Sequence, residues 1–189
     1  MMKENLKRTS KITGAITLAC LASFVIFGLG LGILGEDSAN FIMMNPFISG
    51  FLHGGVEHFL FNIIFIFLLL LPLVNSSFDF KKIFWLTFFI SLVYLPVSVL
   101  GITSPAIGIS GTCAFLASRY FLTWGKNKYL GIGILGFLIF CEIFSMSDPN
   151  NHTAHGVHFI GYLLGFISLK ITLYQKLIPS WIYNRISVV

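Results

Sequence analysis

Six apolar stretches, each long enough to cross a lipid bilayer, make up most of this chain. They cover residues 12–35, 57–74, 83–100, 108–124, 129–146 and 153–173. A helix that spans a bilayer needs about 20 mostly apolar residues. Of the 189 residues, 56% are hydrophobic and only 10% are charged, a composition that excludes an ordinary soluble domain. The sequence therefore predicts an all-α, polytopic membrane protein in which residues 1–189 form a single bundle of six transmembrane helices.

Lysine and arginine residues gather on one side of the predicted membrane. They precede the first stretch, occupy the connections after the second and fourth, and lie at or after the end of the sixth: Lys3, Lys7, Arg8, Lys11, Lys81, Lys82, Lys126, Lys128, Lys170, Lys176 and Arg185. The connections 36–55, 101–107 and 147–152 contain neither residue type. Since basic residues favour the cytoplasmic side, both termini are predicted to be cytoplasmic, with a segment 1–11 before the bundle and a tail of about 174–189 after it.

The net charge of +5 follows from this sidedness and indicates no nucleic-acid partner. The expected surroundings are the lipid bilayer itself, and the sequence gives no oligomeric state. Little chain remains outside the six stretches, which favours a protein of the bacterial inner membrane.

The polar residues best suited to chemistry fall at one depth of the predicted bundle. His58 and Asn62 open the second stretch, Ser110 opens the fourth, and His158 lies near the start of the sixth. In the predicted topology all of these positions are at the outer end of a helix. His58 and Asn62 are four residues apart and therefore share one helix face. Because such groups are costly in lipid, their convergence predicts a functional site in the outer leaflet.

Small residues on two of the stretches predict which helices pack together. They recur at every fourth position: Ser110, Ala114 and Ser118 on the fourth stretch, and Gly161 and Gly165 on the sixth. Strips of this kind let helix backbones approach closely in a membrane. Packing the two strips together brings His158 beside Ser110, and a hydroxyl within hydrogen-bond reach of an imidazole is the minimum for an activated serine.

Acyl transfer also requires donors for the oxyanion that forms when a serine attacks a carbonyl. The backbone N–H of Ser110 and the other free N–H groups at the start of that helix can serve. His58 and Asn62 can add side-chain donors. Gly108 and Gly111 flank the serine and allow backbone and substrate to approach closely.

The sequence offers no obvious acidic partner for His158, so a Ser–His dyad is expected rather than a triad. Glu142, toward the outer end of the fifth stretch, is expected to be solvated at the interface or to hydrogen-bond a neighbouring helix. His152 and His155 are expected to be loop or helix-start residues rather than catalysts.

These residues together resemble the motifs of the rhomboid intramembrane serine proteases. FLHGGVEHFLFN (residues 51–62) fits the family pattern HxxxxHxxxN, GISG (108–111) fits GxSG, and HFIGYLLG (158–165) fits HxxGxxxG. The three motifs occur in the family's order and on its second, fourth and sixth helices. The resemblance covers essentially the whole chain, as the minimal six-helix form.

The resemblance implies a role for each matched position. Ser110 is expected to be the nucleophile and His158 the general base and acid, while His58, Asn62 and the Ser110 amide form the oxyanion hole. His53 is expected to be chiefly structural. The family cleaves transmembrane protein substrates near the membrane boundary and uses no metal or organic cofactor.

Two departures from the family pattern concern the surroundings of the site. Ala114 stands where many members have an aromatic residue that packs against the histidine, and the first outward loop lacks the Trp-Arg pair of many bacterial members. The small size also resembles the rhombosortase branch, which processes C-terminal sorting tags, although the pattern of that branch after the serine is missing.

Two other classes of protein remain open on the sequence. A rhomboid-like module that binds membrane proteins without cutting them would keep the fold and not need Ser110. A metal- or haem-binding membrane protein could use His155 and His158, but the sequence shows no carboxylate or thiol cluster on the outer side to complete a site. A site-2-type metalloprotease is disfavoured because HExxH does not occur.

Overall fold

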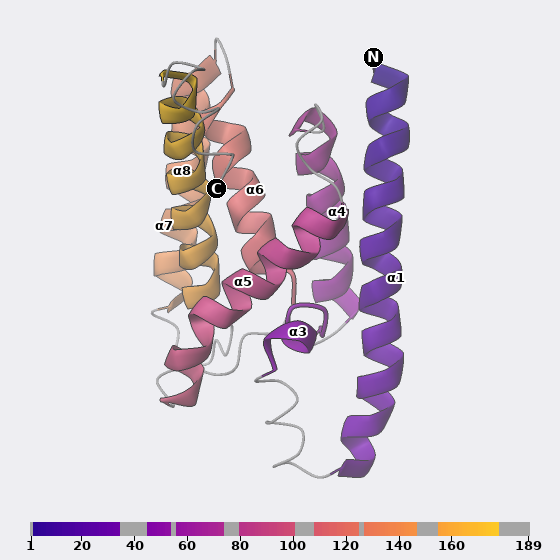
Figure 1. The fold of residues 1–189 in the computed structure, drawn as a ribbon. Coiled ribbons are helices and arrows are strands. Elements are labelled where there is room, and N and C mark those ends of the chain that lie inside the picture. The colour runs from indigo at the N-terminus through magenta and orange to yellow at the C-terminus, as the bar shows by residue number, and fades with distance from the viewer. Residues whose placement is uncertain are drawn as a thin grey trace, which may run out of the picture.

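The computed structural model describes residues 2–34, 45–53, 56–73, 80–100, 108–124, 127–146 and 155–177. Within these ranges the chain forms seven α-helices and no strand: α1 (Met2–Leu34), α3 (Pro46–Ser49), α4 (Val56–Leu73), α5 (Phe80–Val99), α6 (Ser110–Leu122), α7 (Lys128–Met146) and α8 (His155–Leu177). Six of them are long, and α3 is a single short turn before α4 (Figure 1). The prediction of an all-α fold with six long helices is confirmed.

The helices form one bundle with α1 at one edge and the α7–α8 pair at the other (Figure 1). α4 packs between α1 and α6, and α5 crosses the bundle obliquely. α1 begins at Met2, so residues 2–11 of the predicted N-terminal segment form the first part of this helix. Most of the predicted tail 174–189 lies outside the described residues, and α8 runs to Leu177.

Helix α6 is shorter than its predicted stretch, with 13 residues from Ser110 to Leu122. At 1.5 Å per residue this is about 20 Å, against about 30 Å for the hydrocarbon core of a bilayer. The helix is two residues shorter than the prediction at each end, and at its start the cause is Gly108, whose φ of +97° cannot be part of a right-handed helix. Hydropathy alone does not detect this break because the residues before Ser110 are also apolar.

The core lies around α6, in which every residue from Gly111 to Ser118 is buried. The most extensive helix contact is with α8. A Cβ added to Gly161 would overlap the carbonyl oxygen of Gly111, and one added to Gly165 would lie 2.6 Å from the carbonyl oxygen of Phe115. The two backbones are therefore in direct contact, and the predicted packing of the small-residue strips is confirmed.

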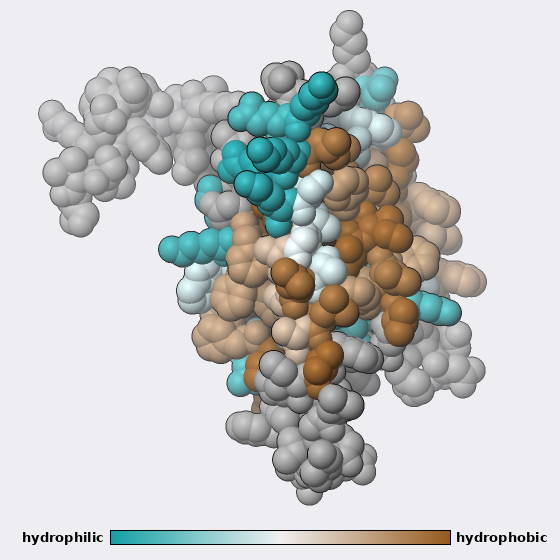
Figure 2. All heavy atoms as spheres, turned by 90° about the vertical axis from the view of Figure 1, so that its right-hand side faces the viewer, coloured by the Kyte–Doolittle hydropathy of each residue, from teal (hydrophilic) through white to brown (hydrophobic). Residues whose placement is uncertain are grey.

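The outer surface of the bundle is largely apolar. On the face formed by α1, hydrophilic residues gather at the end where that helix begins and hydrophobic residues cover the part below (Figure 2). Two helical windows, Val56–Leu73 and Lys128–Ser145, are long and apolar enough to cross a membrane by length and composition, with mean hydropathies of 2.2 and 1.6. Large aromatic side chains such as Phe61 and Phe144 are mostly exposed, at 77% and 71%. Such exposed apolar surface is typical of an interface with lipid or protein.

Candidate active site

The segment before α6 places Ser110 as the first residue of that helix. The N–H of Gly108 donates a hydrogen bond to the carbonyl oxygen of Ser49 at the end of α3, with an N···O distance of 2.8 Å. With φ at +97°, Gly108 occupies a backbone conformation that other L residues adopt only with strain. A Cβ there would lie 2.8 Å from Cε1 of His58 and 3.4 Å from Nδ2 of Asn62. Only glycine therefore fits at this position.

Ser110 and His158 lie within hydrogen-bond distance of each other. The Oγ of Ser110 is 2.8 Å from Nε2 of His158, and the contact joins the first turns of α6 and α8. The direct backbone contact between these two helices brings their first turns close enough for this bond. The structure therefore brings together the serine and the histidine that the sequence analysis paired.

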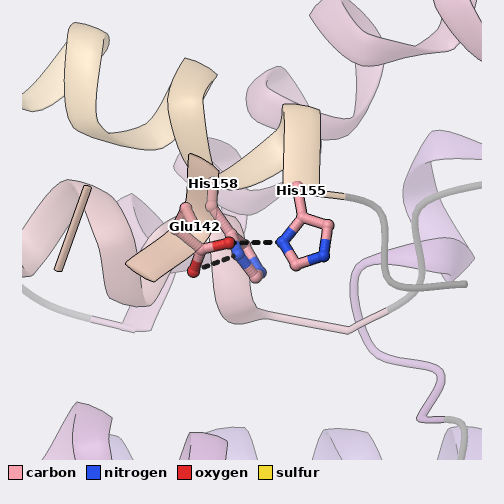
Figure 3. A group of neighbouring side chains, drawn as sticks. All are labelled: Glu142, His155 and His158. Carbon is pink, nitrogen blue, oxygen red and sulfur yellow. Dashed lines mark hydrogen bonds and ion pairs between the residues drawn. The ribbon is translucent and has the colours of Figure 1, made fainter. Parts of the chain in front are cut away.

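Glu142 of α7 bridges two histidines of α8 (Figure 3). One carboxylate oxygen, Oε1, lies 2.8 Å from Nδ1 of His158, and the other, Oε2, lies 2.5 Å from Nδ1 of His155. The three side chains are 20%, 15% and 9% exposed for Glu142, His158 and His155, respectively. A carboxylate only accepts hydrogen bonds, so each imidazole donates its Nδ1–H to Glu142. The lone pair of His158 Nε2 is then left to accept the hydroxyl proton of Ser110.

The prediction that His158 has no acidic partner is wrong. Glu142 hydrogen-bonds a neighbouring helix, which was one of the two outcomes expected for it, but its partner is the histidine of the site itself. His155 does begin a helix as predicted, and it is 8% exposed and bonded to the same carboxylate. His152 lies outside the described residues. The sequence signal that could have found this network is an acidic residue within an apolar stretch, which is rare without a functional reason.

A cavity of about 210 Å³ lies beside the serine–histidine pair. Its lining combines polar groups of the site with apolar side chains from four helices: Phe61, Asn62, Phe65, Ser110, Cys113, Ala114, Leu138, Glu142, His158 and Tyr162. Ala114 also packs against Gly161, so the position where an aromatic residue would be usual is here a wall of the cavity. Tyr162, one helical turn after His158, supplies an aromatic side chain to the same space.

The two side chains predicted as oxyanion donors occupy different places. Asn62 is 6% exposed and lines the cavity, and among the described residues its Nδ2 has no hydrogen-bond partner. Its Oδ1 lies 3.7 Å from the thiol of Cys113, which leaves the amide nitrogen as the group available to a ligand. His58 does not line the cavity and packs instead against Gly108.

His53 lies in the connection between α3 and α4. It is 8% exposed, its Nδ1–H donates to the carbonyl oxygen of Phe51 at 3.1 Å, and its ring centroid is 5.2 Å from that of His58. Burial lowers the pKa of His53 to about 4, and the neighbouring His58 contributes in the same direction. These contacts support the start of α4, where His58 and Asn62 are located.

The cluster of Glu142, His155 and His158 also bears on the metal alternative, since one ligand atom from each lies within 4.8 Å of the others. The premise that no carboxylate accompanies these histidines is therefore wrong. Two ligands of a tetrahedral zinc ion, each about 2.0–2.1 Å from the metal, are about 3.3 Å apart. The observed N···O distances of 2.5 and 2.8 Å are shorter and are those of charge-assisted hydrogen bonds. In this structure the three side chains therefore form a hydrogen-bonded network.

The chain belongs to the rhomboid family: the family model described as Rhomboid domain matches residues 41–175. This match covers the helices that carry the three motifs, and it identifies the chain as an integral membrane protein with a polytopic helical bundle. The family contains serine proteases. Comparison with the curated proteins and with the solved structures found no match.

Proposed function

We propose that this protein is an intramembrane serine endopeptidase that cleaves transmembrane protein substrates near the outer boundary of the membrane. The observation that carries the proposal is the 2.8 Å contact between Ser110 Oγ and His158 Nε2 at the wall of a cavity. A serine is a weak nucleophile until an adjacent base takes its proton. In this site the lone pair on Nε2 of His158 faces the hydroxyl of Ser110. The two residues are therefore arranged for proton transfer from the serine to the histidine.

The reaction proceeds in two halves. Ser110 attacks the carbonyl carbon of the scissile peptide while its hydroxyl proton passes to Nε2 of His158, which gives a tetrahedral intermediate. His158 then donates that proton to the leaving amine, and the C–N bond breaks to leave an acyl-enzyme. A water molecule, deprotonated by His158, attacks the ester and releases the carboxylate product together with free Ser110.

The oxyanion of the tetrahedral intermediate is bound by the start of α6 and by Asn62. Ile109, the N-cap residue of this helix, has no side-chain hydrogen bond to the first N–H groups of the helix. The unpaired Nδ2 of Asn62 lines the same cavity. Fixed donors of this kind are each expected to contribute about 3–4 kcal/mol to transition-state stabilisation.

The length of α6 supports a reaction within the membrane. A helix of 13 residues cannot span the bilayer, so a serine at its first position lies below the membrane surface. A substrate helix has no free peptide carbonyl until it unwinds locally, which favours cleavage near the end of a transmembrane segment. We place the opening of the cavity on the outer side, because the basic residues that mark the cytoplasmic side flank the other ends of these helices.

The experiment that tests the proposal is covalent labelling of the purified protein by a fluorophosphonate probe, which reacts with activated serines. The wild type is expected to be labelled, and Ser110→Ala and His158→Ala are expected to remain unlabelled. Ser118→Ala is a matched control, because Ser118 lies two turns further along the same helix and is buried away from the cavity. It should be labelled like the wild type.

A second measurement extends the test to the substrate. In proteoliposomes, wild-type protein is expected to cut a tagged single-span membrane protein into two fragments, and Ser110→Ala to leave it intact. Absence of both labelling and cleavage in folded wild-type protein would contradict the proposal and favour a rhomboid-like module that binds membrane proteins without cutting them.

A further inference from the structure

We propose that Glu142 and His155 form a positioning unit for His158, so that this protein works with a Ser110–His158–Glu142 triad in place of a dyad. The inference rests on the proposed function, and it adds a role for two residues that the sequence motifs do not include. Glu142 is not expected to touch the substrate. It acts through the imidazole of His158.

The first argument is the match between donors and acceptors. The carboxylate of Glu142 has two oxygens, and each accepts one N–H, from His158 at 2.8 Å and from His155 at 2.5 Å. Binding at both oxygens fixes the plane of the carboxylate. A carboxylate held on one side by His155 cannot turn away from His158, so His155 orients Glu142 and Glu142 orients His158.

The second argument concerns the tautomer of His158. A neutral imidazole carries its proton on one nitrogen only, and a base for Ser110 must keep that proton on Nδ1 and the lone pair on Nε2. The acceptor at Nδ1 is Glu142, and the hydroxyl at Nε2 is Ser110. Glu142 therefore selects the reactive tautomer. When His158 takes the proton from Ser110, the carboxylate also balances the charge of the imidazolium.

The third argument is the position of the charge. Glu142 lies within α7, whose Lys128–Ser145 window has a mean hydropathy of 1.6, and an ionised group in such a segment is costly unless paired. The titratable or polar groups that surround the network come from three helices: His58 and Asn62 of α4, Ser110 and Cys113 of α6, and His155, His158 and Tyr162 of α8. None of these is a lysine or arginine, so within this group the carboxylate of Glu142 is stabilised by the N–H groups of the two histidines.

The experiment compares Glu142→Gln with the matched control Glu57→Gln, an exposed acidic residue in the first turn of α4. A glutamine side chain has one acceptor oxygen and can satisfy only one of the two imidazole donors. We expect Glu142→Gln to lower the rate constant of fluorophosphonate inactivation by about 10²–10⁴-fold with little change in probe affinity. Glu57→Gln should react like the wild type.

Nitrogen-15 NMR of the histidine side chains gives a readout that does not depend on activity. The chemical shifts of the two ring nitrogens report which of them carries the proton, and the His158 signal is assigned by its loss in His158→Ala. We expect wild-type His158 to be the Nδ1–H tautomer and Glu142→Gln to give a mixture. If Glu142 only held α7 against α8, its replacement would lower stability without changing the tautomer of His158.

A second pair of variants keeps the proposal testable if Glu142→Gln does not fold. His155→Leu removes the donor to Oε2 and leaves Glu142 and His158 intact, and we expect about a tenfold slower labelling of Ser110. His155→Gln restores an N–H donor and should recover most of that rate. Recovery of the labelling rate in His155→Gln would show that the loss in His155→Leu comes from the orientation of the Glu142 carboxylate and not from lost packing.

The outcomes distinguish this proposal from the proposed function. Labelling of Glu142→Gln at the wild-type rate, or a His158 tautomer that does not change, would overturn the positioning role while leaving the serine protease intact. Failure of the folded wild type to react would overturn the protease, and the NMR comparison would still decide whether Glu142 sets the tautomer of His158.

Discussion

Gly161 of α8 lies so close to Gly111 of α6 that a Cβ at position 161 would overlap the carbonyl oxygen of Gly111. No side chain separates the two backbones at this point. The serine and the histidine of the site are carried by the adjoining turns of these same helices. Their relative position therefore depends on the backbone contact and cannot be adjusted by a change of rotamer.

The first prediction follows from this contact. Gly161→Ala should destabilise the protein by about 1–3 kcal/mol, because backbone on the facing helix cannot move aside without separating α6 from α8. The melting temperature in detergent should fall, and the labelling of Ser110 should fall with it. Gly133→Ala is the matched control, since no atom lies within 4 Å of a Cβ added there, and a similar loss in that variant would contradict the explanation.

The second prediction concerns Gly108, the left-handed glycine two residues before Ser110. Gly108→Ala should cost about 1–2 kcal/mol in backbone strain and also displace His58, whose Cε1 would lie 2.8 Å from the new Cβ. We expect at least a tenfold loss of fluorophosphonate labelling. The measurement compares the labelling rate of Gly108→Ala with that of the control Gly14→Ala, in which the added Cβ has no atom within 4 Å. Unchanged reactivity would show that this segment does not position the serine.

The third prediction separates the two side chains that the family resemblance groups together. Asn62→Ala should lower kcat by about 10²–10³-fold with little change in KM, because the proposed mechanism uses its amide as a donor to the developing oxyanion. His58→Ala should have a smaller effect on kcat, since His58 contacts Gly108 and does not line the cavity. Kinetics on a fluorogenic membrane substrate gives both constants. An equal or larger loss in His58→Ala would mean that His58 reaches the substrate directly.

The fourth prediction is a dependence of stability on pH. Burial lowers the pKa of His53 from its ordinary value of 6.5 to about 4 in the folded protein. Between these two values the unfolded state binds more protons than the folded state, so stability falls as the pH falls through this window and this group contributes no further change below it.

Thermal melting of the wild type and of His53→Asn between pH 7 and pH 4 measures the contribution of this histidine. Asparagine keeps a donor for the carbonyl of Phe51 but does not titrate. The difference in stability between the two proteins should shift in favour of the variant as the pH is lowered from 6.5. Parallel curves would show that His53 is accessible to protons in the folded state.

Much of the fold follows from the sequence because hydropathy and helix length are local properties. Six apolar stretches gave six long helices, and strips of small residues identified the closest helix pair. The largest difference is at the start of α1, which begins at Met2 and not at residue 12, because a helix can continue through charged residues that a hydropathy window leaves out.

Within the site, the serine and the histidine could be paired from the small-residue strips of their helices, whereas Glu142 stood out as an acidic residue in an apolar stretch but could not be assigned to His158. Glu142 and His158 are sixteen residues apart, on different helices. The rotation of one helix relative to the next depends on the connection between them, and the apolar surface of α7 is too uniform to indicate which face turns inward. Side-chain register of this kind is set by tertiary packing.

The carboxylate that holds His158 comes from α7, whereas the serine and the histidine belong to the joined pair of α6 and α8. Leu138 and Glu142 of α7 also form part of the cavity wall. In the proposed protease, a movement of α7 that widens the cavity would also move Glu142 away from His158. Binding of a bulky substrate and orientation of His158 would then depend on the position of the same helix.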